Sequence, residues 1–296
     1  MANSNRGTLL VEDCELTHVA RHPDEQYILK LRAPRIAERA GPGSFVHLTC
    51  EPSMAMRRPL SIMRASANEG WIEVLFKTVG AGTAALATRS VGDTLSAIGP
   101  IGQGFTPKEE RPLRLLIGGG VGIPPVLFLS EVLNRAGSPP ALVIMGSEVP
   151  FPFELARTQS RIDGVPGEVN STIAELDTQG IPTRLASLQG YGGCYNGYVT
   201  ALAEQWLANL SADDLNQVEI FACGPNPMLA ATAKVAHSFG VPAQVSLEEF
   251  MACAVGGCAG CTVRVSQGNE VAMKRVCVDG PVFDAASIDW ATLASH

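Results

Sequence analysis

The chain has 296 residues, of which 46% are hydrophobic and 17% charged, and it carries a formal net charge of -7. Such a chain is long enough for two or three compact units with a large core, and its composition is far from that of a disordered protein. The acidic balance argues against nucleic acid or an anionic membrane as a partner, because both need clustered Lys and Arg.

The N-terminal residues show no apolar stretch and no cleavage site of a secretory signal, which predicts a cytoplasmic protein. The longest uncharged stretch, residues 115–129, is interrupted by glycine and proline. It falls short of the roughly 20 apolar residues that cross a bilayer. We therefore expect no membrane segment.

Residues 1–107 have the texture of a β-rich unit. Short runs bounded by Gly, Pro or Asp are typical of strands, and they lie at residues 7–11, 26–31, 44–49, 71–78 and 94–98. Strands at this spacing predict a small β-barrel.

Two motifs in this unit suit a flavin cofactor. In residues 57–62, Arg58 and Ser61 follow a strand, where an arginine can hold a pyrophosphate and a serine can hydrogen-bond a flavin ring. In residues 80–83, Gly-Ala-Gly-Thr, the glycines let backbone N–H groups reach phosphate. Neither motif decides alone, because arginine pairs are often solvated surface charges and such glycines also occur in ordinary turns.

Between residues 108 and 245, predicted strands and helices alternate, which is typical of parallel α/β units. Predicted strands lie at residues 113–117, 141–145 and 218–222, and predicted helices at residues 124–134, 198–210 and 227–239. Residues 154–189 show no clean period and predict loops and short elements.

The first strand of this unit runs through a glycine turn into a helix, and the turn contains Gly118, Gly119, Gly120 and Gly122. The start of such a helix attracts phosphate. The turn departs from the dinucleotide fingerprint G-x-G-x-x-G, because Ile123 occupies the position of the last glycine.

A second strand-to-helix turn consists of Cys223, Gly224 and Pro225, and the next residue, Asn226, is a good candidate for a helix N-cap. Ligands of open α/β sheets bind at the carboxyl ends of the strands, so both turns can face one cofactor. A pair of purely structural turns is the alternative.

Four of the eight cysteines lie in a small third unit, residues 246–296. Cys253, Cys258 and Cys261 have the spacing C-x4-C-x2-C, which plant-type [2Fe-2S] ferredoxins use for three of their four thiolate ligands. A loop around a cluster needs positive φ angles, which favours its glycines Gly256, Gly257 and Gly260.

The fourth ligand is predicted by a β-hairpin. Residues 262–265 and 271–276 are typical of strands, and the residues between them predict a turn centred near Asn269. Positions 261 and 277 are equidistant from this centre, so the hairpin returns Cys277 to Cys261.

Zinc is the alternative metal. Structural zinc sites usually contain two close C-x2-C pairs, whereas here three ligands share one loop, so the spacing favours an iron-sulfur cluster. Cys14, Cys50 and Cys194 have no partner at such a spacing, and we interpret them as small apolar residues.

The order of these motifs resembles the ferredoxin-NADP reductase superfamily and, within it, the electron-transfer subunit of the two-component, NAD-linked dihydroorotate dehydrogenase. The resemblance covers nearly the whole chain and is most specific at residues 251–261 and 275–283. There are two departures: Ala254 stands where the family usually has glycine, and residues 150–195 match poorly.

This resemblance implies a multi-domain α+β protein. Residues 1–107 would form an FAD-binding β-barrel, residues 108–245 an NAD-binding α/β domain with a parallel sheet, and residues 246–296 a small [2Fe-2S] domain. FAD, NAD(H) and a [2Fe-2S] cluster would be the cofactors. Electrons would pass to or from an FMN-containing catalytic subunit that oxidises dihydroorotate to orotate, within a hetero-oligomer.

The resemblance also implies site residues. FAD contacts would be Arg58, Pro59, Leu60, Ser61, Leu75, Phe76, Lys77, Gly82 and Thr83. Nicotinamide contacts would be Gly118, Gly119, Gly120, Gly122, Cys223, Gly224 and Pro225. Ser61 and Cys223 would be the catalytic residues, one near the reactive edge of the flavin and the other against the nicotinamide. Cluster ligands would be Cys253, Cys258, Cys261 and Cys277.

Other functions remain open at this point. Electron-transfer subunits of NAD(P)H-ferredoxin and sulfide oxidoreductases share the same motifs, and a stand-alone NAD(P)H reductase or a non-catalytic, zinc-stabilised interaction protein would also fit. Glu148, just after a predicted strand, would disfavour a 2'-phosphate if it lies at the ribose, which favours NAD(H).

Overall fold

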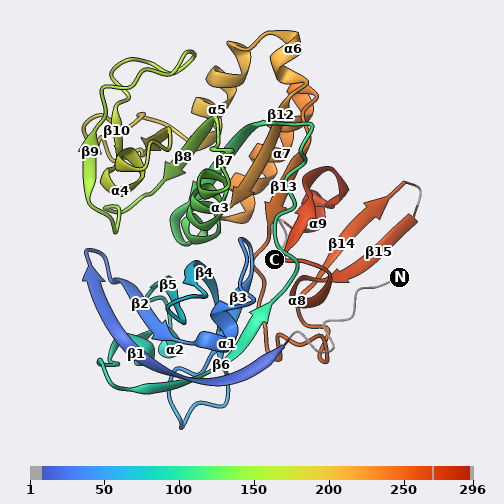
Figure 1. The fold of residues 1–296 in the computed structure, drawn as a ribbon. Helices are drawn as coiled ribbons and strands as arrows, with labels where there is room; N and C mark the ends of the chain where they lie inside the picture. Colours follow the sequence, from blue (N-terminus) through green and yellow to red (C-terminus); the bar gives the residue numbers. More distant parts are fainter. Residues whose placement is uncertain (1–8, 269, 294–296) are drawn as a thin grey trace.

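A computed structural model of the chain describes residues 9–268 and 270–293. In Figure 1 a β-barrel lies below an α/β unit, and a C-terminal part with a projecting hairpin lies beside both. Among the described residues, no helix is long and apolar enough to cross a membrane.

Six antiparallel strands close the barrel in the order β1-β2-β5-β4-β3-β6. Their bounds are β1 Leu10–His22, β2 Gln26–Arg32, β3 Phe45–Leu48, β4 Arg58–Ser66, β5 Trp71–Lys77 and β6 Thr94–Ile101. Two short helices, α1 Pro34–Ala37 and α2 Ala81–Ala87, add buried side chains to the barrel core. The predicted barrel is confirmed, but β4 and most of β1 were not predicted as strands.

A six-stranded sheet forms the core of the α/β unit, in the order β11-β8-β7-β12-β13-β16. The first five strands are parallel, and β16 is antiparallel. The strands are β7 Leu113–Gly119, β8 Leu142–Gly146, β11 Thr183–Ala186, β12 Val218–Cys223, β13 Ala243–Ser246 and β16 Val282–Asp284.

Helices cover both faces of this sheet, because its strands are apolar on both sides. They are α3 Ile123–Arg135 on one face and α5 Val199–Ala208 and α7 Asn226–Phe239 on the other. The short helices η1 Gly120–Gly122 and α6 Ala212–Leu215 lie between these elements in the chain. Leu116, Val143 and Phe221 pack with α3, while neighbouring strand residues such as Leu115 and Ile144 pack with α5 and α7. The alternation of side chains along a strand accounts for this division.

The segment 154–189 contains short elements, as predicted: β9 Leu155–Arg157, β10 Ser171–Ile173 and α4 Ala174–Thr178. Its last strand, β11, is a full member of the parallel sheet and was not predicted. The prediction for the start of α7 was wrong. The N-cap of α7 is Pro225, so Asn226 is already helical and does not cap. The predicted end of α7 at Gly240 is confirmed by its left-handed φ of 65°.

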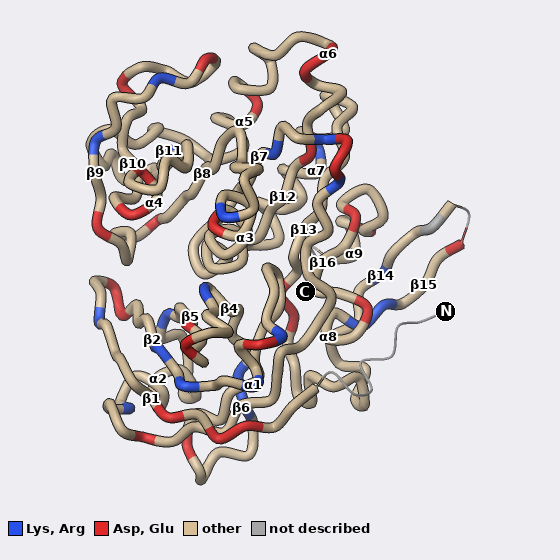
Figure 2. The backbone as a smooth tube through the Cα atoms, viewed as in Figure 1, with Lys and Arg blue, Asp and Glu red and all other residues tan. Residues whose placement is uncertain are grey.

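The C-terminal part begins with the cysteine loop and continues through β14 Thr262–Gln267, β15 Glu270–Arg275, α8 Val276–Asp279, η2 Ala285–Ser287 and α9 Trp290–Leu293. Its strand β16 extends the α/β sheet by pairing with β13. The boundaries drawn from the sequence at residues 107/108 and 245/246 therefore stay predictions. Basic and acidic residues are interleaved over the barrel and the α/β unit (Figure 2).

Candidate functional site

The first group of candidate residues lies where β4 starts beside α2. Nη1 of Arg58 donates to the carbonyl oxygens of Met56 (3.0 Å) and Arg57 (3.1 Å). A Cβ atom at Gly82 would overlap the Arg58 guanidinium group, so only glycine lets the arginine lie across this turn. The structure thus brings the two flavin motifs together.

Other residues of the two motifs shape this corner. Leu60 is buried, and Ser61 is half-buried opposite Phe45 of β3. The Thr83 hydroxyl accepts hydrogen bonds from the backbone N–H groups of Val79 (3.0 Å) and Gly80 (3.2 Å). The side chain of Thr83 therefore holds the turn in shape.

The end of β5 completes the barrel side of the site. The side chains of Leu75 and Phe76 are buried, and Phe76 stacks on Tyr27 with 5.2 Å between ring centroids. Among the described pairings, β4 follows β5 only as far as Val74, so residues 75–77 continue beyond that ladder. Any contact of Leu75 and Phe76 with a ligand must therefore use their backbone.

On the α/β side, the two strand-to-helix turns touch each other. β7 and β12 are neighbours in the sheet, with Gly118 opposite Cys223. A Cβ atom at Gly122 would come within 2.5 Å of the Cys223 carbonyl group and of the Gly224 nitrogen. Gly119 and Gly224 pack against the same side chain, Met228. Both turns lie at the carboxyl edge of the sheet, as predicted.

Cys223 is buried, with 7% of its surface exposed. Burial raises the pKa of its thiol to about 12, and the nearby Glu248 carboxylate acts in the same direction, against a hydrogen bond from Ser246. The thiol is therefore protonated at neutral pH and can act as a hydrogen-bond donor.

Sequence reasoning missed Glu248. The residue follows β13, which is the neighbour of β12 in the sheet, so it reaches the same carboxyl edge as Cys223. The signal that could have found it is the rule that ligands bind at the carboxyl ends of parallel strands, because Glu248 stands just after such a strand.

The four C-terminal cysteines stand as two pairs. Cys258 donates its backbone N–H to Sγ of Cys253 (3.4 Å), and the Sγ atoms of Cys261 and Cys277 are 3.3 Å apart. Within residues 9–268 and 270–293, no three His, Cys, Asp or Glu side chains already converge as a metal site.

The hairpin meets Cys261 by a slightly different register from the predicted one. Pairing runs from Thr262↔Arg275 to Gln267↔Glu270, and the backbone N–H of Val276 donates to the Cys261 carbonyl oxygen (2.9 Å). Cys277 therefore meets Cys261 from the first turn of α8. The predicted centre of the turn, Asn269, lies outside the described residues.

Left-handed backbone in the cysteine loop falls only partly on glycine. Of the three glycines expected to need it, Gly256 has a φ of 82°, whereas the other left-handed residues are Ala254 and Ala259, both with φ of 55°. The alanine at 254, where the family usually has glycine, thus occupies a conformation that glycine adopts more easily. Arg275 fixes the loop by donating to the Gly256 carbonyl oxygen (3.0 Å).

The pKa values of two of these cysteines suit an iron-sulfur cluster, which binds cysteine as thiolate. Partial burial opposes ionisation of Cys253, but backbone N–H groups of Val255 and Cys258 lower its pKa to about 7. A hydrogen bond from Cys277 lowers the pKa of Cys261 to about 6, while the pKa of Cys277, the donor, is raised. N–H groups directed at sulfur are typical of iron-sulfur sites.

Comparison with known proteins agrees with this site. Residues 248–289 match the family model of the iron-sulfur cluster binding domain of dihydroorotate dehydrogenase B. The dihydroorotate dehydrogenase B (NAD(+)) electron transfer subunit of Bacillus caldolyticus is 34% identical over 270 residues, which are 90% of this chain and 93% of that protein. The chain belongs to the family of dihydroorotate dehydrogenase B electron transfer subunits. The subunit of Desulforamulus reducens is 29% identical over 95% of this chain and 98% of its own length.

Solved structures extend the likeness of this electron transfer subunit to a wider fold. The structure of an NADH-dependent reduced ferredoxin-NADP oxidoreductase matches with a TM-score of 0.72 and 25% identity, over 95% of this chain and 91% of that one. A ferredoxin reductase of carbazole 1,9a-dioxygenase matches with a TM-score of 0.60 and 22% identity, over 79% and 67% of the two chains, which shows a shared fold. The expected ferredoxin-NADP reductase fold of the electron transfer subunit is confirmed.

Proposed function

We propose that this chain carries electrons between NAD(H), FAD and a [2Fe-2S] cluster, for an FMN-containing dihydroorotate dehydrogenase subunit in pyrimidine biosynthesis. The observation that carries the proposal is that one chain brings four cysteines together in pairs and also packs two strand-to-helix turns of the nucleotide-binding type against each other. Cys277 is brought to within 3.3 Å of Cys261 by the hairpin, and the cysteine loop follows directly from β13 at the carboxyl edge of the sheet.

Flavin binding is assigned to the barrel corner. Arg58 supplies positive charge for a pyrophosphate, and Gly82 leaves room for the Arg58 guanidinium group. Ser61, on the same strand, is the hydroxyl donor for the flavin ring, supported by its half-buried position three residues further along β4. Backbone groups of residues 75–77 line the other side.

Nicotinamide binding is assigned to the turns at residues 118–122 and 223–225. Their backbones pack closely enough to leave a surface of N–H groups for a pyrophosphate. The protonated thiol of Cys223 orients the nicotinamide by hydrogen bonding, with Glu248 beside it. Glu148, exposed just after β8, would repel a 2'-phosphate, which favours NAD(H) over NADP(H).

Cluster binding is assigned to Cys253, Cys258, Cys261 and Cys277. Flavin, when bound, links the two-electron chemistry of the nicotinamide to the one-electron chemistry of an iron-sulfur cluster. The protein's own part is to hold thiolates ready, which the lowered pKa values of Cys253 and Cys261 support. The catalytic subunit completes a hetero-oligomer, in the cytoplasm.

Replacing Cys258 by Ser tests this function. Cys258 is exposed, so the chain should fold, keep its yellow flavin and still have that flavin reduced by NADH under anaerobic conditions, but iron and sulfide content should fall to near zero. Cys194→Ser, at a cysteine of the α/β unit, is the matched control and should keep the cluster.

Two results would contradict the proposal. A Cys258→Ser protein with a full cluster would remove the ligand assignment, and wild-type protein that contains zinc but no iron or flavin would favour the zinc-stabilised alternative. The partner is tested by co-expression with a dihydroorotate dehydrogenase catalytic subunit. NAD-dependent orotate formation should need both chains.

A further inference from the structure

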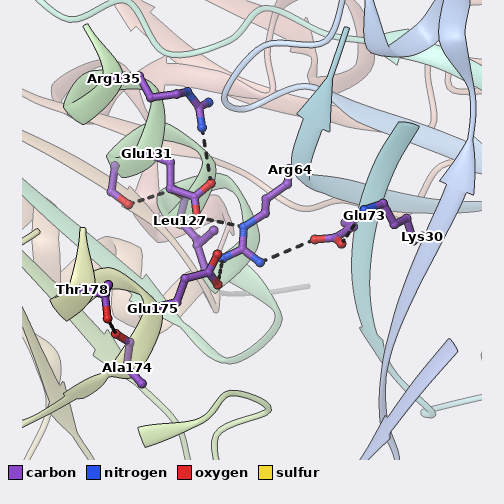
Figure 3. A network of polar contacts seen from close by, with 10 residues as sticks. Lys30, Arg64, Glu73, Leu127, Glu131, Arg135, Ala174, Glu175 and Thr178 are labelled. Carbon is purple, nitrogen blue, oxygen red and sulfur yellow. Dashed lines mark hydrogen bonds and ion pairs between the residues drawn. The ribbon is translucent and has the colours of Figure 1, made fainter. Parts of the chain in front are cut away.

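Arg64 is a nearly buried cation at the junction between the barrel and the α/β unit. It lies on β4, three residues beyond Ser61, and 16% of its side chain is exposed. Charged residues of both signs lie where the barrel faces α3 (Figure 2). Figure 3 shows Arg64 at the centre of this group, between carboxylates that come from separate elements.

Each side of the Arg64 guanidinium group faces a different carboxylate. Nε donates to Oε1 of Glu131 on α3 (2.8 Å), Nη2 to Oε2 of Glu175 on α4 (2.6 Å), and Nη1 lies 3.5 Å from Oε2 of Glu73 on β5. One side chain of the barrel therefore holds two elements of the α/β unit at once (Figure 3). A planar guanidinium fixes the directions of these contacts, which a point charge cannot do.

The contact with Glu131 is the most buried one. Only 5% of the Glu131 side chain is exposed; burial raises the pKa of its carboxyl group, and Arg64 opposes this effect. Two outer cations balance the group: Lys30 lies 3.9 Å from Glu73, and Arg135 lies 3.8 Å from Glu131. Three carboxylates thus meet three cations, with Arg64 in the middle.

Arg64 also connects the two halves of the proposed site. Its strand carries Arg58 and Ser61, and α3, which holds Glu131, starts directly after the glycine turn at residues 118–122. Apolar packing between the barrel and α3 holds them together but gives little directional preference. The directed contacts of Arg64 can set the angle between them.

We propose that Arg64 is a positioning residue, which sets the orientation of α3 and α4 against the barrel and thereby the position of the nicotinamide relative to the flavin. The inference rests on the proposed function. Hydride transfer is sensitive to such placement, because a displacement of about 1 Å can cost about 100-fold in rate.

The test compares Arg64→Gln with Arg135→Gln in flavin-loaded, full-length protein. Both changes remove one positive charge that faces Glu131, but the Arg135 contact stays within α3, whereas the Arg64 contact crosses between the units. Flavin reduction by saturating NADH is followed in an anaerobic single turnover. We expect Arg64→Gln to slow it by about 10-fold or more, with Arg135→Gln within about twofold of wild type.

A double variant separates positioning from folding. Arg64→Met with Glu131→Leu removes the buried charge together with its partner, so its melting temperature should return toward the wild-type value. Its flavin reduction should stay slow if Arg64 sets the geometry. Recovery of the rate in the double variant, or a wild-type rate in Arg64→Gln, would overturn the inference. Wild-type protein whose flavin NADH does not reduce would instead overturn the proposed function.

Discussion

Arg57 and Arg58 are neighbours in the sequence but bind different parts of the protein. Arg57 is turned into the barrel, where Nη1 donates to the carbonyl oxygens of His47 and Ser96 and Nη2 to the Ser96 hydroxyl (3.1 Å). It joins β3 to β6. Arg58 lies over Gly82 instead. Since successive side chains of an extended chain point to opposite sides, one arginine serves the fold and the other remains available for a ligand.

His47, which Arg57 contacts through its carbonyl group, is an unusual core residue. It is 1% exposed, and its ring lies against backbone groups of Arg57 and Met251, whose hydrogen bonds act against the effect of burial on its pKa. Burial, together with the positive charge of Arg57, lowers its pKa from 6.5 to about 4. The ring is therefore neutral in the folded protein at pH 5, where an unfolded chain would bind a proton.

This difference predicts an acid-sensitive core. Because the pKa of His47 is lower in the folded state, the unfolded chain binds a proton first as the pH falls below 6.5. The free energy of unfolding is therefore unaffected by this group above pH 6.5 and decreases as the pH falls towards about 4. Between pH 7.5 and 5, urea unfolding of wild-type protein should show a loss of about 2 kcal/mol from this residue. His47→Asn should flatten this dependence. His18→Asn, at an exposed position, is the control, and equal slopes in all three proteins would contradict the prediction.

At the scale of elements, the nicotinamide side of the site depends on two turns that fit backbone to backbone. Gly122 has a φ of -85°, which any residue can adopt, so its lack of a side chain matters for space alone. An added Cβ would meet the Cys223 carbonyl group and the Gly224 nitrogen at 2.5 Å, and neither can rotate away. The β7–α3 and β12–α7 turns are thus held in one arrangement.

We therefore expect Gly122→Ala to push these turns apart. The overlap should cost about 1–3 kcal/mol of stability and weaken NADH binding about 10-fold or more. Thermal unfolding and NADH titration of the flavin-loaded protein measure the two effects. Gly167→Ala is the control, because a Cβ there meets nothing within 4 Å. Unchanged NADH affinity in Gly122→Ala would show that the turns do not share the ligand.

The sequence predicted those elements whose signals are local. β7 and β12 were found because continuous apolar runs end at clear turn residues, and α7 because a proline marks its start and Gly240 its end. Most of β1 was missed, because its only buried side chains are Cys14 and Leu16, and the acidic residues Glu12, Asp13 and Glu15 interrupt the apolar pattern around them. β11 was missed because it contains Arg184, and a charged residue argues against a buried strand in the sequence pattern. In the structure Arg184 is nonetheless buried, and its guanidinium group donates to the Thr183 carbonyl oxygen (2.8 Å).

The same distinction holds for the site. The pairing of Cys261 with Cys277 was predicted by counting along one hairpin, and only its register differed. Arg64 could not be found in this way, because its partners Glu131 and Glu175 lie 67 and 111 residues further along the chain. Their approach depends on how α3 and α4 meet the barrel, which no local pattern contains.

At the scale of the whole molecule, the three parts share their cores. Phe128 of α3 is buried in the hydrophobic core of the barrel, and Met63 of β4 is buried with residues of α3 and the sheet. The C-terminal part is tied in as well, since the backbone N–H of Leu247 donates to the Pro281 carbonyl oxygen (2.9 Å) and β16 extends the sheet. Figure 1 shows α3 between the sheet and the barrel.

Shared cores predict that barrel and α/β unit unfold together, and that Phe128 is one of the residues that couple them. Coincident urea transitions are expected for wild-type protein, with flavin release reporting the barrel and helical circular dichroism the α/β unit. Phe128→Ala removes an aromatic side chain of α3 from the barrel core and should cost about 3–5 kcal/mol, with flavin release moving to lower urea than the loss of helix.

Leu202→Ala on α5 is the control, because this fully buried residue lies in the α/β core, away from the barrel side of the sheet. It should lower both transitions together. Coincident transitions in Phe128→Ala would mean that the units are coupled through other contacts, with the directed bonds of Arg64 as the first to examine.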